Sequence, residues 1–597
     1  MIRLHRVTRR KLNFSLSSSP SSPSSPSSTN PGRRLLIMSL TSTTTPSTNH
    51  SFSTSPPSLQ SSNAENVKLA EQDAVIGKQA PESLTVNGIK ARREKAGKLV
   101  AGTAAYSDSD MFKSPQAYDK PKARRWDHLL SQESLLRKPC ALKQAAKHLK
   151  KPGLISLGGG LPSASNFPID SISMHVPTPP HFTEAETATT GQDVKVGKYD
   201  AAKNENGGVF DLSIAMNYGQ SVGSAQLLRW VTEHTELINN PPYADWRCSL
   251  TIGSTGALEQ ALRMFCDRTR NDAILTEEYS FSTALETAAP LGIKVFGVRM
   301  DGEGLLAESL DEILSTWDES ARDGARKPSV LYTVPSGQNP TGATQSLQRR
   351  KDIYKVCQKH DIFILEDEPY YFLQMLPYTG PDSPAVPPPA TIEEFLSGLV
   401  PSLLSMDVDG RVMRMDSFSK VVVPGSRVGW ITASEQVVER YIRHAEVCSQ
   451  GPGGISQILM YKLVDETWGH EGYMRWLMHL RLEYTRRRDA ILAACEKYLP
   501  RDIVSWVPPA AGMFLWLKVD HTQHPSTKSI LELESDIFDR GIEKGVLAIR
   551  GSWFCAEQEK PPSGLFFRTT YAAASEDDMA HAIERFGAAV RESFGRP

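Results

Sequence analysis

One lysine follows a strand-like segment in a turn that is rich in hydroxyl groups. The stretch 416–430 contains Ser417, Ser419 and Lys420, and Arg427 comes seven residues after the lysine. Burial at a strand end lowers the pKa of a lysine ammonium group, and the neutral amine is a nucleophile towards an aldehyde. Ser417 and Arg427 are suited to binding a phosphate dianion beside that amine. A surface lysine after a strand is the alternative interpretation.

Two more turns place an amide and a carboxylate near the ends of apolar runs. Asn339 lies within 335–342, Pro-Ser-Gly-Gln-Asn-Pro-Thr-Gly, where prolines and glycines fix a rigid turn. Asp367 follows the apolar run 362–366 and precedes Tyr370 by three residues. Open α/β sheets bind ligands at the carboxyl ends of their strands. Asp367 is therefore a candidate partner for a protonated ring nitrogen, and Tyr370 for a ring oxygen. The alternative for the Asn339 segment is an ordinary structural turn, and the alternative for Asp367 is a solvated acid in a loop.

A predicted helix start and another strand end supply further candidates. Ser254 and Thr255 precede the helical pattern 257–268, and free N–H groups at a helix N-terminus favour an anion. A serine that only caps the helix would occupy the same position. Tyr279 follows the predicted strand 273–276 and offers a flat ring for stacking on a heteroaromatic group.

The elements that must position these residues alternate along the middle of the chain. Helical patterns at 257–268 and 347–360, and others after 437, separate short runs rich in β-branched residues. Strands that are apolar on both faces and separated by helices predict a parallel sheet covered on both sides. The predicted strands are 273–276, 294–298, 330–334, 362–366, 412–416 and 428–432.

The C-terminal part has a different pattern and predicts a smaller α+β domain. A long helix is expected at about 473–498, and strands are expected at 512–519, 545–550 and 565–571. We expect folded sequence to begin near Trp126, and 177–210 to form a long irregular surface loop. The expected divisions are a terminal segment 1–64, a polar extension 65–125, an arm with the irregular insertion 126–210, a large domain 211–455 and a small domain 456–597.

Residues 1–64 differ in composition from the rest of the chain. They contain no Asp or Glu, seven Arg or Lys residues and long Ser/Thr/Pro tracts. Such a composition predicts disorder. Its basic, acid-free start is also typical of a mitochondrial transit peptide. An ordinary disordered tail is the alternative, and Met38 is a second candidate start of translation. The sequence therefore leaves the location open between cytoplasm and mitochondrial matrix.

Whole-chain composition excludes several classes of protein. The 597 residues carry a formal net charge of −1 and are 40% hydrophobic. No strongly basic surface is therefore expected for nucleic acid, and no apolar run reaches the roughly 18 residues of a membrane span. The seven cysteines are scattered without a CxxC pair, so we expect neither a disulfide framework nor a bound metal.

Taken in order and spacing, these motifs resemble the fold-type I aminotransferases that use pyridoxal 5′-phosphate. The resemblance rests on Asn-Pro-x-Gly at 339–342, Asp-x-x-Tyr at 367–370 and Ser-x-Ser-Lys-x6-Arg at 417–427. It runs from about Trp126 to the C-terminus. It implies a large domain with a mostly parallel seven-stranded sheet, joined to a smaller α+β domain.

Other segments are similar to the kynurenine/2-aminoadipate aminotransferase group. They are 155–162, which contains Gly160; Asn217-Tyr218-Gly219; and 567–572, which contains Arg568. The insertion before Tyr218 and the length of the tail most resemble fungal aromatic amino acid aminotransferases. The resemblance thus implies transamination of Phe, Tyr and Trp with 2-oxoglutarate as acceptor, by a ping-pong mechanism in a homodimer.

The resemblance also implies a role for each candidate residue. Lys420 would hold the cofactor covalently and move the proton, with Asp367 on the pyridine nitrogen and Asn339 and Tyr370 on the ring oxygen. Tyr279 would stack on the ring. The phosphate would be bound by Ser254, Thr255, Ser417 and Arg427, with Tyr218 supplied across the dimer. The substrate would contact Arg568, Asn339 and Gly160.

Three alternatives remain at this point. Kynurenine or 2-aminoadipate is an alternative substrate, because no local motif decides the side-chain preference. A lyase or synthase of the same fold would use the same cofactor. A transcription regulator with an aminotransferase-like domain would need a basic helix-turn-helix module before the large domain, where residues 1–125 have proline and serine tracts instead.

Overall fold

The computed structural model describes residues 84–145 and 157–596, except 159, 204–208, 382–383 and 385. All of them belong to the second of two units into which the chain divides, residues 62–597. The segment 1–64 and part of the predicted motif at 155–162 lie outside the described residues. No helix of the described part is both long and apolar enough to cross a membrane.

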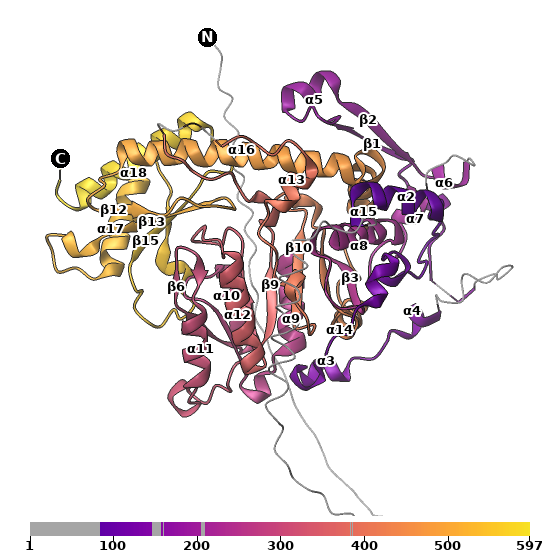
Figure 1. The fold of residues 1–597 in the computed structure, drawn as a ribbon, viewed down its shortest axis with the longest axis horizontal. Coiled ribbons are helices and arrows are strands. Elements are labelled where there is room, and N and C mark those ends of the chain that lie inside the picture. The colour runs from indigo at the N-terminus through magenta and orange to yellow at the C-terminus, as the bar shows by residue number, and fades with distance from the viewer. Residues whose placement is uncertain are drawn as a thin grey trace, which may run out of the picture. The chain divides into compact units, whose positions relative to one another are not determined.

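A seven-stranded sheet forms the centre of the large domain (Figure 1). Its strand order is β3-β11-β10-β9-β8-β4-β5. Only β11 runs antiparallel to its neighbours, so the predicted mostly parallel seven-stranded sheet is confirmed. The strands are β3 (Trp246–Thr251), β4 (Ala273–Glu277), β5 (Lys294–Val298), β8 (Val330–Thr333), β9 (Phe363–Asp367), β10 (Val412–Ser417) and β11 (Gly429–Ser434).

Strand β9 illustrates why both faces of this sheet are apolar. Phe363 and Leu365 are buried in the hydrophobic cluster that includes Phe265 of α9 (Ser254–Phe265). Ile364 points to the opposite cluster, which includes Ile353 of α12 (Leu347–His360). Because side chains alternate along a strand, residue 367 falls on the α9 face and residue 366 on the α12 face.

Within the large sheet, the strand missed by sequence analysis is β3, at the edge. Its apolar pattern is interrupted by Arg247 and Ser249, yet the strand is almost entirely buried. The N-terminal extension provides the cover, since the Cys248 N–H donates to Ser109 Oγ (2.8 Å) and Arg247 pairs with Asp110 (2.5 Å). The apolar residues of β3 therefore lie in the core of the large domain, and contacts made by another segment cover its polar residues.

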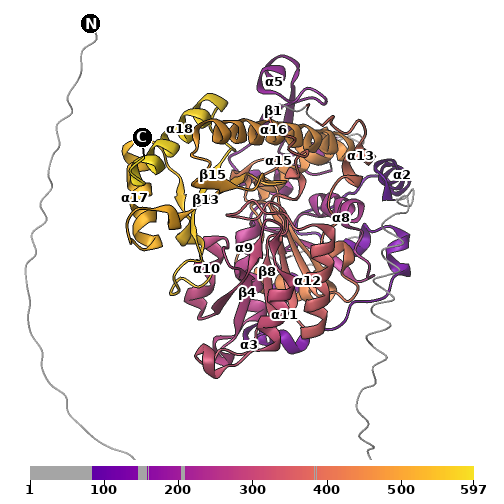
Figure 2. The same ribbon diagram turned by 60° about the vertical axis from the view of Figure 1, so that its left-hand side comes forward.

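The small domain contains a four-stranded antiparallel sheet in the order β12-β13-β15-β14. Its strands are β12 (Val504–Trp506), β13 (Phe514–Val519), β14 (Ile549–Arg550) and β15 (Leu565–Thr570). The helices α16 (Gly469–Tyr498), α17 (Ile530–Glu543) and α18 (Glu576–Ser593) share one core with it. Figure 2 shows these elements together, in orange to yellow, beside the large sheet.

Two expectations about the N-terminal part are wrong. Folded structure begins before Trp126, because α2 (Val86–Ala96) is fixed on the large domain by Arg93, which pairs with Glu233 (2.5 Å) and with Asp465. The insertion is not wholly irregular either: β2 (Gln192–Gly197) pairs with β1 (Ser171–Val176), and α5 (Glu184–Thr190) joins them. Both elements escaped prediction because they are mostly polar and exposed. In α2 only Ile89 is buried, and in β1 and β2 only the last or next-to-last residue is buried, so neither segment shows a clear hydrophobic periodicity.

Candidate active site

A cavity of about 340 Å³ lies at the carboxyl ends of β8, β9 and β10, beside the N-terminus of α9. Nine of the twelve predicted site residues line it, although they come from segments more than 300 residues apart. These nine are Ser254, Thr255, Asn339, Asp367, Tyr370, Ser417, Lys420, Arg427 and Arg568. The parallel sheet brings most of them together, and β15 of the small domain adds Arg568.

Asp367 has one carboxylate oxygen that nothing in the described chain satisfies. Its Oδ2 accepts a hydrogen bond from the Tyr332 hydroxyl (2.9 Å), whereas Oδ1 is buried and has no partner among the described residues. Burial raises the pKa of Asp367 to about 6, and the hydroxyl groups of Tyr332 and Ser254 partly oppose this rise. A buried acceptor without a donor is unfavourable. A bound ring with a cationic N–H group would supply the missing donor.

The N-terminus of α9 and Arg427 form a cradle for an anion. Gly253 precedes the helix with φ +83°, and a Cβ there would lie 2.4 Å from Arg427 Nη2. Arg427 donates to the Ile252 carbonyl (3.1 Å) and to Ser419 Oγ (3.3 Å), and it has no acidic partner among the described residues. Ser254 Oγ is buried at the start of the same helix and lies close enough to Asp367 to lower the pKa of that carboxyl. Helix N–H groups and a guanidinium together suit a phosphate.

Lys420 lies in the turn after β10, and no ion pair involving it occurs in the part of the chain that the structure describes. Burial, together with the positive charges of Arg427 and Arg568, lowers the pKa of its ammonium group. A larger fraction of neutral amine is therefore present near pH 7 than in a solvated lysine. Ser417 and Ser419 order this turn, because the Ser419 N–H donates to Ser417 Oγ (3.1 Å).

Arg568 presents an unpaired guanidinium to the cavity. Its Nη1 donates to Asn339 Oδ1 (2.8 Å), and its Cζ lies 4.5 Å from the ring centre of Phe514 and 4.7 Å from that of Phe554. No carboxylate lies within 4 Å of it among the described residues. Burial lowers the pKa of Arg568, as expected for a cation removed from water. This oriented and uncompensated charge is suited to a carboxylate ligand.

Aromatic and apolar side chains complete the wall of the cavity. Burial and the nearby Asp367 raise the pKa of Tyr370, so its hydroxyl stays protonated and can donate a hydrogen bond. Its ring meets Phe514 edge-on at 5.9 Å. Sequence analysis missed Phe514, Tyr332 and Phe281, all of which line the cavity. Alternation along the strand of Tyr332 would have placed it on the same sheet face as Asp367.

The prediction for Tyr279 disagrees with the structure. Its hydroxyl lies 2.9 Å from Ser563 Oγ, and its ring packs edge-on against Trp516 (5.4 Å) and Phe566 (5.2 Å) of the small domain. The residues after β4 form a bridge to the small domain at Tyr279, which turns this side chain away from the cavity. Phe281, two residues later, lines the cavity instead.

Two other predicted residues also lie outside this cavity. Gly160 is exposed, and a Cβ added to it would meet nothing within 4 Å. Tyr218 is 58% exposed and lines a separate cavity of about 400 Å³. Within one chain neither residue contributes to the site around Lys420.

The chain is similar to known proteins over most of its length. Residues 199–586 match the family model "Aminotransferase class I and II". An aromatic amino acid aminotransferase of Schizosaccharomyces pombe is 44% identical over 78% of this chain and 98% of its own. An L-tyrosine:2-oxoglutarate aminotransferase of Tapinella panuoides is 36% identical over 68% of this chain and 76% of its own. The crystal structure of aminotransferase Aro8 from Candida albicans covers 80% of this chain and 100% of its own at 40% identity, with a TM-score of 0.73. The chain therefore belongs to the class I and II aminotransferases, which use pyridoxal 5′-phosphate as their cofactor.

Proposed function

We propose that this aminotransferase acts on the aromatic amino acids Phe, Tyr and Trp and uses 2-oxoglutarate as the acceptor, by a ping-pong mechanism. The observation that carries the proposal is one cavity that combines the amine of Lys420 and the unpaired guanidinium of Arg568 with walls formed by Phe281, Tyr370 and Phe514. The relatives named for aromatic amino acids and for tyrosine and 2-oxoglutarate support this substrate class.

The unsatisfied groups of the cavity fit pyridoxal 5′-phosphate. The cradle at α9 suits its phosphate, through Ser254, Thr255, Ser417 and Arg427. The free Oδ1 of Asp367 suits its pyridinium N–H group. Asn339 and Tyr370 would then bind the ring oxygen, and Phe281 takes over the stacking role first predicted for Tyr279. When bound, the cofactor supplies an electron sink that stabilises negative charge at the substrate Cα.

The protein's own groups bind the substrate and move the proton. Arg568, held by Asn339, fixes the α-carboxylate that every amino acid and oxo acid substrate carries. The Lys420 amine, with its lowered pKa, accepts the Cα proton and returns a proton in the second half of the reaction. Phe514 and Phe281 exclude water and offer apolar contact to an aromatic side chain. The two substrates occupy this one cavity in turn.

The same proposal includes a homodimer. Tyr218 is exposed and lies outside the cavity of its own chain, so its predicted contact with a phosphate requires a second subunit. Gly160, also exposed, would approach the substrate only after a rearrangement of its segment or across the same interface.

A substrate panel tests the proposed function. Purified holoenzyme is mixed with Phe, Tyr, Trp, kynurenine or 2-aminoadipate in the absence of acceptor, and the cofactor absorbance is followed. We expect the aromatic amino acids to convert the cofactor fastest, and 2-oxoglutarate to reverse the change. Preference for kynurenine or 2-aminoadipate would move the protein to that substrate group. Product release without reversal by 2-oxoglutarate would indicate a lyase or synthase.

A reporter fusion separates the two candidate locations, the cytoplasm and the mitochondrial matrix. Residues 1–64, fused to a fluorescent reporter, should direct import if they form a transit peptide. A diffuse cytoplasmic signal would instead favour an ordinary tail.

A further inference from the structure

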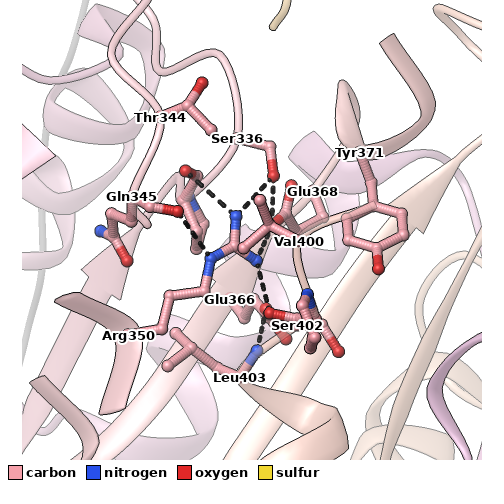
Figure 3. A network of polar contacts seen from close by, with 12 residues as sticks. Ser336, Thr344, Gln345, Arg350, Glu366, Glu368, Tyr371, Val400, Ser402 and Leu403 are labelled. Atoms are coloured by element: carbon pink, nitrogen blue, oxygen red, sulfur yellow. Dashed lines mark hydrogen bonds and ion pairs between the residues drawn. The ribbon is translucent and has the colours of Figure 1, made fainter. Parts of the chain in front are cut away.

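A fully buried arginine, Arg350 of α12, lies at the centre of a network of polar contacts (Figure 3). A guanidinium has five N–H donors, and in Arg350 all five have an acceptor. Nε donates to the Gln345 carbonyl (3.2 Å), Nη1 to Glu368 Oε1 (3.4 Å) and the Pro401 carbonyl (3.2 Å), and Nη2 to the Pro335 carbonyl (3.4 Å) and Ser336 Oγ (2.9 Å).

These acceptors belong to the turns that carry two active-site residues. Residues 335–345 form the loop that contains Asn339, and Glu368 directly follows Asp367. Ser336 Oγ also donates to Glu368 Oε1 (3.0 Å), which closes a triangle with Arg350. The guanidinium therefore ties the Asn339 loop to the end of β9 from the face opposite the cavity.

A second buried arginine extends the network to the turn that carries Lys420. Arg414 pairs with both carboxylate oxygens of Asp416 (2.8 Å each), just before Ser417. Its Nη1 lies 3.5 Å from Glu366 Oε1, next to Asp367 in the chain. Strand alternation explains the arrangement, because the residues on either side of Asp367 point away from the cavity.

We propose that Arg350 is a positioning residue for transamination: it holds Asn339 and Asp367 at their working separation and, through Asn339, orients Arg568. This inference rests on the proposed roles of Asn339 and Asp367. Arg350 does not line the cavity, so it acts only through the two turns that it joins. A displacement of about 1 Å at a reacting group can cost about 100-fold in rate.

Lysine cannot replace Arg350, whereas glutamine can replace its partner. A lysine ammonium has three donors and no planar fork, so it cannot serve all five acceptors of Arg350. Burial raises the pKa of Glu368, and the positive charges of Arg350 and Arg414 oppose this rise. Glu368→Gln keeps an oxygen acceptor at the same position and should preserve the triangle. Glu368→Leu removes that acceptor.

Arg411 offers a matched control. It is equally buried, and it donates to the Cys357 and Ile362 carbonyls (2.8 Å each) and to Asp409. These contacts lie at the N-terminal ends of β9 and β10, the opposite ends from the active site. Arg411→Lys should therefore destabilise the fold without altering the site.

The experiment compares Arg350→Lys, Arg411→Lys, Glu368→Gln and Glu368→Leu with the unaltered enzyme. The readouts are kcat and KM for phenylalanine and 2-oxoglutarate, the Kd for pyridoxal 5′-phosphate, and the Tm of the cofactor-free protein. We expect Arg350→Lys to lower kcat/KM for both substrates by about 100-fold and to weaken cofactor binding by about tenfold. Arg411→Lys should lower Tm as much as Arg350→Lys does. Its kcat/KM and its Kd for the cofactor should stay within about threefold of the unaltered enzyme.

The Glu368 pair keeps the proposal testable if Arg350→Lys does not fold. We expect Glu368→Gln to stay close to the unaltered enzyme and Glu368→Leu to lose activity and cofactor affinity. Equal losses of kcat/KM and cofactor affinity in Arg350→Lys and Arg411→Lys would overturn the positioning role, and so would equal activity and cofactor affinity of the two Glu368 variants. Absence of phenylalanine turnover by the unaltered enzyme would instead contradict the proposed substrate, and the cofactor Kd would still decide the role of Arg350.

Discussion

Replacing Arg568 with lysine keeps a positive charge in the cavity but removes the geometry that holds it. The guanidinium donates to Asn339 (2.8 Å), and its Cζ lies over the rings of Phe514 (4.5 Å) and Phe554 (4.7 Å). It has no acidic partner among the described residues, so its remaining donors are free for a substrate carboxylate. A lysine at this position can offer one donor to that carboxylate but loses the two-point contact.

The expected loss follows from the number of contacts removed. A hydrogen bond to a charged group contributes about 1.5–3 kcal/mol, and both the second substrate contact and the Asn339 contact are weakened. We therefore expect Arg568→Lys to cost about 2–4 kcal/mol of transition-state stabilisation, or about 30- to 1,000-fold in kcat/KM. Because every substrate carries the α-carboxylate, phenylalanine, tyrosine, glutamate and 2-oxoglutarate should lose similar factors.

Steady-state kinetics with these four substrates test the prediction, and Arg550→Lys is its control. Arg550 lies on the neighbouring strand β14 and also stacks on aromatic rings, those of Phe538 (5.1 Å) and Trp553 (6.0 Å), but it does not line the cavity. The control should stay within about threefold of the unaltered enzyme. A loss in Arg568→Lys confined to glutamate and 2-oxoglutarate would refute the reasoning, since the arginine would then bind the side-chain carboxylate.

The remaining predictions concern the cofactor and the assembly. Burial raises the pKa of Asp367 from 3.8 to about 6, so the folded cofactor-free protein binds more protons than the unfolded chain between these values. This group therefore makes the free energy of unfolding fall as pH rises from about 4 to 6, and Asp367→Asn should flatten that decline in urea titrations. Asp367→Asn should also reduce kcat by several orders of magnitude, and a variant within about threefold of the unaltered enzyme would contradict its role. Phe281→Ala should weaken binding of pyridoxal 5′-phosphate, measured by fluorescence titration, whereas Tyr279→Phe should not; the reverse order would restore Tyr279 as the stacking residue. Light scattering at assay concentration should show a dimer. Tyr218→Phe should weaken cofactor binding by about tenfold without dissociating the dimer, and an active monomer would contradict the shared site.

Much of the site could be predicted because its reactive residues lie in short sequence motifs. An apolar strand that ends in Asp367 and a turn that presents Lys420 each combine a structural and a chemical signal in a few residues. Tyr279 was misplaced because sequence does not reveal at which residue the turn after β4 bends towards the small domain. Arg350 was missed for a related reason: α12 is rich in charged residues, and the contacts of this one side chain come from distant segments, 335–345, Glu368 and Pro401.

The covalent position of the cofactor tests the central claim most directly. Holoenzyme is reduced with borohydride, digested, and searched by mass spectrometry for the lysine that carries the pyridoxyl group. The geometry predicts the label on Lys420, the lysine that lines the cavity together with Asp367 and Arg568. Lys420→Ala should lose the label and the transamination activity together. Recovery of the label on another lysine, or full activity of Lys420→Ala, would contradict the account.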